Sequence, residues 1–145
     1  MKKIILLLIL IIPIQISQHN QRNLINLESL KIQILKLSPL TLSNLESYIH
    51  LLNIQHPTIV IKQAILETGW LSSRVCKTHN NLFGLVYNGR YAKFSHWTES
   101  VRAYKNFQNK RYNSGCYYTF LKRRGYASDR NYIKKLKSIE YGTIG

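Results

Sequence analysis

The chain has few acidic residues. Its 145 residues include 6 Asp and Glu against 21 Lys and Arg, which gives a formal net charge of +15 at pH 7. Such a balance concerns partners and solubility rather than fold, and it suits an anionic polymer or an acidic envelope surface. The shortage of carboxylates also leaves few residues able to carry acid–base chemistry.

Metal-ligand patterns are missing too, and cysteine is scarce. The five histidines do not have the spacing of metal ligands, so we expect neither a metal nor a cofactor. The two cysteines, Cys76 and Cys116, could form one disulfide in an exported protein or could stay free. Sequence alone does not decide between these, because it does not show whether the two Cα atoms lie close enough.

No apolar run has the roughly 20 residues that a transmembrane helix needs. Residues 4–12 are uninterruptedly apolar, follow two lysines and end before Pro13. This pattern predicts a secretory signal over residues 1–17 with cleavage near Ser17, or else a short uncleaved anchor. In both cases we expect a secreted or periplasmic protein of the cell envelope.

Beyond that segment the chain has room for one domain. Residues 18–37 are rich in Gln and Asn and predict a tether, with a short helix over 27–37 as an option. The packed domain is expected over residues 38–145.

Within this domain the pattern is mainly helical. Pro57 and Gly69 suit the first position and the C-terminus of a helix. Ser43 and Glu46 have the spacing of a capping box. Residues 72–80 read as a polar connection. The expected helices cover residues 43–52, 57–69, 97–112, 117–124 and 131–139.

One hairpin interrupts the helices. Asn88-Gly89 stands between two short runs of β-branched and aromatic residues within 83–94. This dipeptide in that context is a strong signal for a two-residue hairpin turn. We therefore expect a small two-stranded lobe.

One carboxylate stands in an apolar helix. Glu67 lies near the end of the helix expected over 57–69, on one stripe with Val60 and Ala64. Burial would raise its pKa, and a carboxylic acid that is still protonated near neutral pH is what general-acid catalysis needs. A solvated surface glutamate is the ordinary alternative at a helix end.

Four segments in this order look familiar: QAILETGWLSS, NNLFG, FSHWTESVRAY and GYASDRNYIKKL. Over roughly residues 59–139 the chain resembles the bacterial glucosaminidase domain (lysozyme subfamily 2) of glycoside hydrolase family 73, which includes flagellar cell-wall hydrolases and autolysins. The resemblance implies an α+β, predominantly α fold, a lysozyme-like helical domain whose small β-hairpin lobe faces a glycan cleft. It also implies an exported endo-β-N-acetylglucosaminidase that cleaves the β-1,4 glycosidic bond of peptidoglycan, the N-acetylglucosamine/N-acetylmuramic acid glycan.

Residue roles follow from matching these motifs. Glu67 matches the catalytic acid of the family, and Tyr126 matches a tyrosine beside it. The candidate catalytic residues are therefore Glu67 and Tyr126, whose hydroxyl could orient the acetamido group of the substrate or the incoming water. Asn81 and Phe83 belong to the NNLFG motif, where Asn81 could instead satisfy turn backbone groups, and Phe83 could be core. The candidate substrate-binding residues are Asn81, Phe83, Tyr87, Tyr91, Trp97 and Tyr132. Trp97 could likewise belong to the core.

The chain departs from the family in the hairpin. Many members carry a second glutamate there, whereas residues 85–95 contain no carboxylate. Glu99 matches a position where a helix-dipole role is the simpler interpretation. A single acid therefore fits better: Glu67 would protonate the leaving oxygen, and the 2-acetamido group of the substrate would stabilise the developing cation.

Several alternatives stay open. The same acid could direct the 6-hydroxyl of the sugar, as in a lytic transglycosylase, or the enzyme could be a muramidase. The chain could also be an inactive module that binds cell-wall glycan. A nucleic-acid binder would fit the charge, but no nucleic-acid motif accompanies it and the export signal argues against it. We expect a monomer that acts on peptidoglycan strands, with at most transient contact to anionic envelope components.

Overall fold

The structure is a computed structural model that describes residues 2–126 and 128–141. It divides into two units, Met1–Leu37 and Ser38–Gly145. The first unit is one helix, α1 (Lys2–Leu37). Within the described residues, no helix combines the length and the apolar character needed to cross a membrane.

The segment expected to be a tether contains more helix than the sequence predicted, and its role as a tether stays a prediction. Residues 18–37 are helical throughout as part of α1 (Lys2–Leu37), not only from residue 27 onward. Their Gln and Asn content predicted a tether with at most a short helix, but the segment has no glycine or proline and many residues with good helix propensity. The predicted signal segment is the start of the same helix, and its cleavage stays a prediction.

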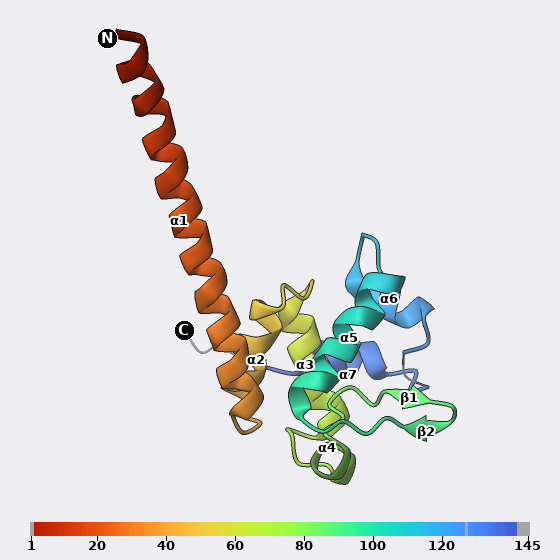
Figure 1. The fold of residues 1–145 in the computed structure, drawn as a ribbon. Helices are drawn as coiled ribbons and strands as arrows, with labels where there is room; N and C mark the ends of the chain where they lie inside the picture. Colours follow the sequence, from red (N-terminus) through yellow and green to blue (C-terminus); the bar gives the residue numbers. More distant parts are fainter. Residues whose placement is uncertain (1, 127, 142–145) are drawn as a thin grey trace. The chain divides into compact units, whose positions relative to one another are not determined.

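The second unit is mostly helical with one two-stranded antiparallel hairpin, as the sequence predicted (Figure 1). The helices expected over 57–69, 97–112, 117–124 and 131–139 are all present, each within two residues of the expected bounds. Its elements are α2 (Leu42–Leu51), α3 (Pro57–Thr68), α4 (Arg74–His79), β1 (Val86–Tyr87), β2 (Arg90–Tyr91), α5 (Trp97–Arg111), α6 (Tyr117–Arg123) and α7 (Tyr132–Ser138).

Two local predictions were wrong. The N-cap of α2 is Thr41, whose hydroxyl accepts a hydrogen bond from the Asn44 backbone N–H at 3.1 Å, so the expected capping box at Ser43 does not form. The polar connection over 72–80 contains α4. That helix is capped by Ser73, whose hydroxyl accepts from the Cys76 backbone N–H at 3.2 Å.

Helix α3 is central to the packing of the second unit. It packs against both α2 and α7. Four apolar side chains, Val60, Ile61, Ala64 and Ile65, are at most 1% exposed. The helix begins at Pro57 and ends before Gly69, whose φ of +53° is the left-handed conformation that stops a helix. The predicted bounds of this helix are confirmed.

The hairpin also forms as expected. Val86 pairs with Tyr91 and Tyr87 with Arg90, in antiparallel register. Asn88 and Gly89 both have positive φ, +51° and +74°, as a type I′ turn requires.

Both cysteines are free thiols. Cys76 is buried in α4, and burial raises the pKa of its thiol. Cys116 is exposed at the start of α6. The bridge that the sequence left open is not formed.

Candidate active site

Glu67 lies in the last turn of α3 and is half-buried. The stripe that it shares with Val60 and Ala64 faces the core, since both of these are fully buried. Burial raises the pKa of the Glu67 carboxyl above its ordinary value, and a hydrogen bond from Tyr132 offsets part of that rise. Burial therefore favours the protonated form of the Glu67 carboxyl, and the interaction with Tyr132 favours its charged form.

Gly84 brings the segment before the hairpin against this carboxyl. An added Cβ at this position would lie 3.1 Å from Glu67 Oε2, so the neighbouring carboxyl would have to give way. The backbone φ of Gly84 is +61°, which L-residues with side chains adopt only at a cost. Glycine therefore allows the last residue of NNLFG to approach Glu67 closely.

Two tyrosines complete the surroundings of Glu67. Tyr126, after α6, donates its hydroxyl hydrogen to the Phe83 backbone carbonyl at 2.9 Å. Its ring lies 5.9 Å from that of Tyr132. Burial raises the pKa of both phenols well above the usual value, and the nearby Glu67 charge raises it further. Because the Tyr126 hydrogen is engaged by Phe83, its hydroxyl can act toward a ligand only as an acceptor.

A cavity of about 360 Å³ opens beside this group. Gly84 and Tyr126, both neighbours of Glu67, form part of its wall. The full lining is Phe83, Gly84, Leu85, Val86, Tyr87, Phe107, Arg124 and Tyr126. The cavity thus lies between the hairpin and the helical side, next to two neighbours of Glu67.

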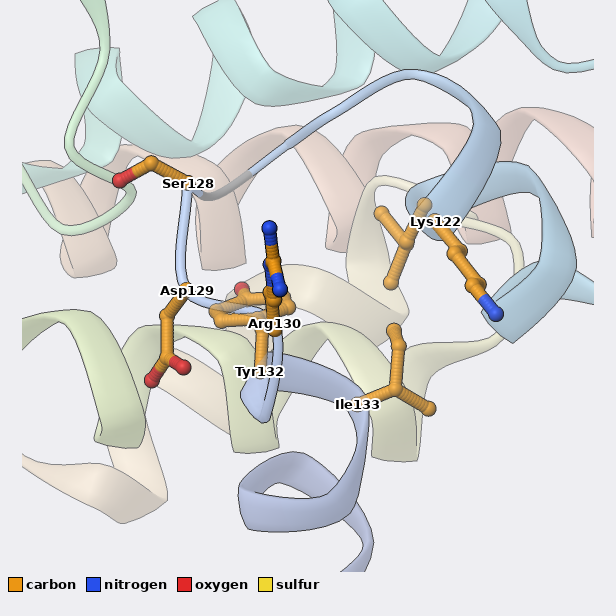
Figure 2. Close-up of a pocket in the computed structure, with 7 residues that line it drawn as sticks. Lys122, Ser128, Asp129, Arg130, Tyr132 and Ile133 are labelled. Atoms are coloured by element: carbon orange, nitrogen blue, oxygen red, sulfur yellow. The ribbon is translucent and has the colours of Figure 1, made fainter.

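A second cavity of about 500 Å³ lies between α6, α7 and the segment that joins them. Figure 2 shows Lys122 on one side of it and Ser128 and Asp129 on the other. Asp129 is engaged, because its carboxylate accepts from Lys135 Nζ at 2.6 Å. The cavity shares Tyr132 with the site around Glu67. Leu121, Arg130 and Ile133 complete the lining.

Asn81 has the structural role that the sequence analysis gave as the alternative to substrate binding. Its side-chain amide donates to the Leu85 carbonyl at 2.8 Å and to the Ala92 carbonyl at 3.1 Å, and its Oδ1 accepts from the Leu85 N–H at 3.0 Å. These bonds tie the two ends of the hairpin together. The side chain is 2% exposed, so it is not presented to a ligand.

Two predicted aromatic contacts also belong to the core. Trp97 is 2% exposed, packs edge-on against Tyr48 and donates its indole N–H to the Ser38 carbonyl at 2.9 Å. Phe83 is buried against the Tyr104 ring, with ring centroids 4.2 Å apart, although it forms part of the cavity wall. For Trp97 the core interpretation is the correct one.

The two hairpin tyrosines are exposed. Tyr87 and Tyr91 have 57% and 55% of their surface accessible. Tyr87 lines the cavity beside Glu67, whereas Tyr91 is not part of its lining. Tyr87 is therefore the better placed of the two for contact with a ligand.

Two other glutamates of the second unit have hydrogen-bond partners of their own. Glu99 is exposed and accepts from Ser95, from the N–H at 3.0 Å and from the hydroxyl at 2.8 Å, and these bonds lower its pKa. Glu46 accepts from the Tyr141 hydroxyl at 2.8 Å. The described part of the chain also holds no group of three His, Cys, Asp or Glu side chains placed to bind a metal ion.

Sequence reasoning missed the residues behind Tyr132. Gln63, on α3, is fully buried and donates from Nε2 to the Tyr132 hydroxyl at 3.2 Å. Tyr104 on α5 donates in turn to Gln63 Oε1. A single amide within an otherwise apolar helix was the available signal, because a buried amide needs partners.

This arrangement of a half-buried glutamate, two tyrosines and a glycine from NNLFG agrees with a comparison to protein families. Residues 45–142 match the glucosaminidase family model, described as mannosyl-glycoprotein endo-beta-N-acetylglucosaminidase. The chain belongs to the glucosaminidase family. This confirms the resemblance seen in the sequence, and membership indicates a glycoside hydrolase that acts on glycans. Neither the curated proteins nor the solved structures include a significant match to this chain.

Proposed function

We propose that this glucosaminidase-family chain is an exported endo-β-N-acetylglucosaminidase of peptidoglycan with Glu67 as its general acid. The observation that carries the proposal is the state of the Glu67 carboxyl. It is half-buried, its pKa is raised by burial, and it lies against Gly84, a residue that lines a cavity. A carboxyl in this state keeps its proton to higher pH than an exposed one, as a general acid must.

The cleavage step needs one proton and one nucleophile. Glu67 gives its proton to the glycosidic oxygen, the bond from that oxygen to C1 breaks, and the carbonyl oxygen of the 2-acetamido group of the same sugar bonds to C1. Water then attacks C1, the bond from C1 to the acetamido oxygen breaks so that the 2-acetamido group is restored, and a proton of the water returns to Glu67. The 2-acetamido route is the known exception to the two-carboxylate scheme. Its support here is that Glu99 and Glu46, the other glutamates with described contacts in the second unit, are engaged elsewhere.

The charge of the chain supports peptidoglycan as the substrate. The net charge of +15 favours a glycan whose peptide side chains and attached polymers bear carboxylates or phosphates. The apolar N-terminal run favours export, where such a glycan is found. Tyr87 and Arg124 on the cavity wall would offer one sugar-stacking face and one cation to it.

The decisive experiment is digestion of purified peptidoglycan, followed by reduction and mass spectrometry of the fragments. New reducing ends on N-acetylglucosamine are expected. Reducing ends on N-acetylmuramic acid would show a muramidase, and 1,6-anhydro ends would show a transglycosylase. Binding without fragments would leave only a wall-binding module.

A second substrate checks the other half of the proposal. The family model is described by an activity on mannosyl-glycoprotein, so a glycoprotein with oligomannose chains is assayed in parallel. Release of those chains with no fragments from peptidoglycan would overturn peptidoglycan as the substrate. The role of Glu67 as the general acid would then be tested on the oligomannose glycan.

A further inference from the structure

A continuous chain of side-chain hydrogen bonds runs through the core of the second unit to the Tyr132 hydroxyl, and this hydroxyl interacts with Glu67 and lowers the pKa of its carboxyl. The chain of hydrogen bonds starts at the backbone of residue 55 and passes through residues of α3, α5, α6 and α7 that are at most 7% exposed. In order, its members are Gln55, Gln108, Tyr117, Tyr104, Gln63, Tyr132 and Glu67. We call this set the buried relay.

The start of the buried relay has a fixed direction. A backbone N–H can only donate and a backbone carbonyl can only accept. The Gln55 N–H donates to Gln108 Oε1 and the Gln55 carbonyl accepts from Gln108 Nε2, both at 2.9 Å. The Gln108 amide therefore cannot be flipped. Its Nε2 also donates to the Tyr117 hydroxyl oxygen at 3.0 Å.

The direction passes on through two tyrosines, since each hydroxyl has one hydrogen to give. Tyr117 accepts from Gln108 and gives its own hydrogen to Tyr104, with 2.6 Å between the oxygens. Tyr104 gives its hydrogen to Gln63 Oε1. Gln63 Nε2 then gives a hydrogen to the Tyr132 hydroxyl oxygen.

The opposite orientation of Gln63 is unfavourable. If the Gln63 amide were flipped, Tyr132 would donate to Gln63, and Tyr104 would donate to Tyr117. The Tyr117 hydrogen would then have no acceptor among the relay members, and leaving a buried donor without an acceptor is destabilising. Tyr132 would also turn an oxygen lone pair toward Glu67. The orientation described above uses the hydroxyl hydrogens of both Tyr117 and Tyr104.

We propose that Gln63 is a positioning residue: its buried amide, oriented by Tyr104, holds the Tyr132 hydroxyl as a fixed donor to one oxygen of Glu67. The role rests on the proposed function of Glu67 as the general acid. The oxygen that accepts from Tyr132 is thereby kept as the carbonyl oxygen of the protonated carboxyl. The catalytic proton is placed on the other oxygen, from which it is given to the glycosidic oxygen.

This role predicts a measurable change at Glu67. Replacing Gln63 by methionine, which has similar volume and no amide, frees the Tyr132 hydroxyl to turn away. Glu67 then loses a donor that stabilises its charged form, so its pKa rises. We expect a rise of about half a unit to one unit, a three- to tenfold change in the acid constant. The basic limb of the pH–rate profile should move upward by the same amount.

The titration can be read directly. The chain contains five glutamates, Glu28, Glu46, Glu67, Glu99 and Glu140. Carbon-13 labelling of the glutamate side-chain carboxyls therefore gives few signals in an NMR titration. The Glu67 signal is the one missing from Glu67→Gln. This measurement reports on the carboxyl whether or not the protein cleaves any glycan.

A double-mutant cycle distinguishes positioning from a general structural effect. Tyr132→Phe removes the donor itself and should raise the pKa of Glu67 by at least as much as Gln63→Met. In the Tyr132→Phe background, Gln63→Met should then change the Glu67 pKa no further, because Gln63 acts through Tyr132. The control is Tyr48→Phe, which removes a buried hydroxyl that has no hydrogen-bond partner among the described residues. It should leave the Glu67 titration unchanged.

An unchanged Glu67 pKa in a folded Gln63→Met protein would overturn the inference, as would equal shifts with and without the Tyr132 hydroxyl. If Gln63→Met does not fold, Tyr104→Phe is the second variant, because it removes the hydrogen that orients the Gln63 amide. It should raise the Glu67 pKa in the same direction. A chain that cleaves no glycan would overturn the proposed function instead, and the NMR titration would still decide whether Gln63 orients Tyr132.

Discussion

The two sides of the candidate active site are built differently. On the helical side, Glu67 and Tyr132 are held by α3 and α7, and the side chains behind them are buried and hydrogen-bonded. On the hairpin side, β1 and β2 have two residues each, and Tyr87 and Tyr91 are more than half exposed. The side that carries the acid is fixed by the core, and the side offered to a ligand is exposed, as is usual for a binding surface on a rigid scaffold.

Two residues join these sides. Asn81 ties the ends of the hairpin together through three hydrogen bonds. Gly84 brings the segment before β1 against Glu67. Changes on the helical side should therefore affect the chemical step, and changes on the hairpin side should affect binding.

The largest effect is expected from the carboxylate on the helical side. Glu67→Gln keeps the shape and removes the transferable proton, so the cleavage rate should fall by about a thousandfold, within the range for general-acid catalysis. The measurement is the initial rate on purified peptidoglycan, with wall binding assayed by co-sedimentation. Glu99→Gln is the matched control, because Glu99 is exposed and bonded to Ser95. Its rate should stay within about twofold of the parent, and an equal loss in both variants would mean that the acid has been misassigned.

The junction between the two sides is tested by a pair of glycines. Gly84→Ala and Gly89→Ala both place a side chain at positive φ, which costs about 1–2 kcal/mol of stability. Only at Gly84 does the new Cβ meet a carboxyl, 3.1 Å from Glu67 Oε2, whereas at Gly89 nothing described lies within 4 Å. Both variants should melt lower by a similar amount, and Gly84→Ala alone should lose about tenfold or more in kcat. Equal kcat losses would contradict the close approach.

The hairpin side is tested by its two tyrosines. Tyr87 lines the cavity beside Glu67 and Tyr91 does not. Tyr87→Ala should raise KM about three- to fivefold with little change in kcat, as expected when a contact made equally in the ground and transition states is lost. Tyr91→Ala should raise KM less. A fall in kcat for Tyr87→Ala with an unchanged KM would place the tyrosine in the chemical step instead.

The smallest expected effect is a change in how the stability of the folded protein depends on pH. Burial raises the pKa of Glu67 in the folded protein above its unfolded value of about 4.3. The folded state therefore holds the proton more tightly, and stability falls as the pH rises from the unfolded value through the folded one. Glu67→Gln removes this loss, so its melting temperature relative to the parent should rise by a few degrees between pH 4 and pH 7.5.

Calorimetric melts of both proteins across that range test the effect. Parallel curves would mean that the pKa of Glu67 is unshifted by folding. Because unfolding is followed on intact protein, the result does not depend on any substrate.

Much of the second unit could be predicted from local patterns. Pro57 and Gly69 bound α3, and Asn88-Gly89 forms the hairpin turn, because each of these residues limits its own backbone. Errors arose where a local pattern had more than one solution. The polar stretch over 72–80 could be a loop or a short helix, and the segment over 18–37 could be a coil or a helix.

The candidate site was predictable in part. Glu67 stood out because a lone carboxylate in an apolar helix is costly to ionise unless a partner or water compensates. For Asn81 and Trp97 the sequence left a structural role and a substrate-binding role open, and it could not name their partners, because the carbonyls of Leu85, Ala92 and Ser38 are backbone atoms that any residue supplies. Sequence does not mark such partners.

Taken alone, the sequence determined the helices and the turn of the second unit, the family, and the candidate acid, since these depend on residue type and spacing along one chain. The tertiary structure decided what Glu67 is bonded to. Gly84, Tyr132 and, behind it, Gln63 reach the carboxyl from segments up to 69 residues apart along the chain. The direction of those hydrogen bonds is set by which donor faces which acceptor in the folded core, and no pattern along the sequence contains that information.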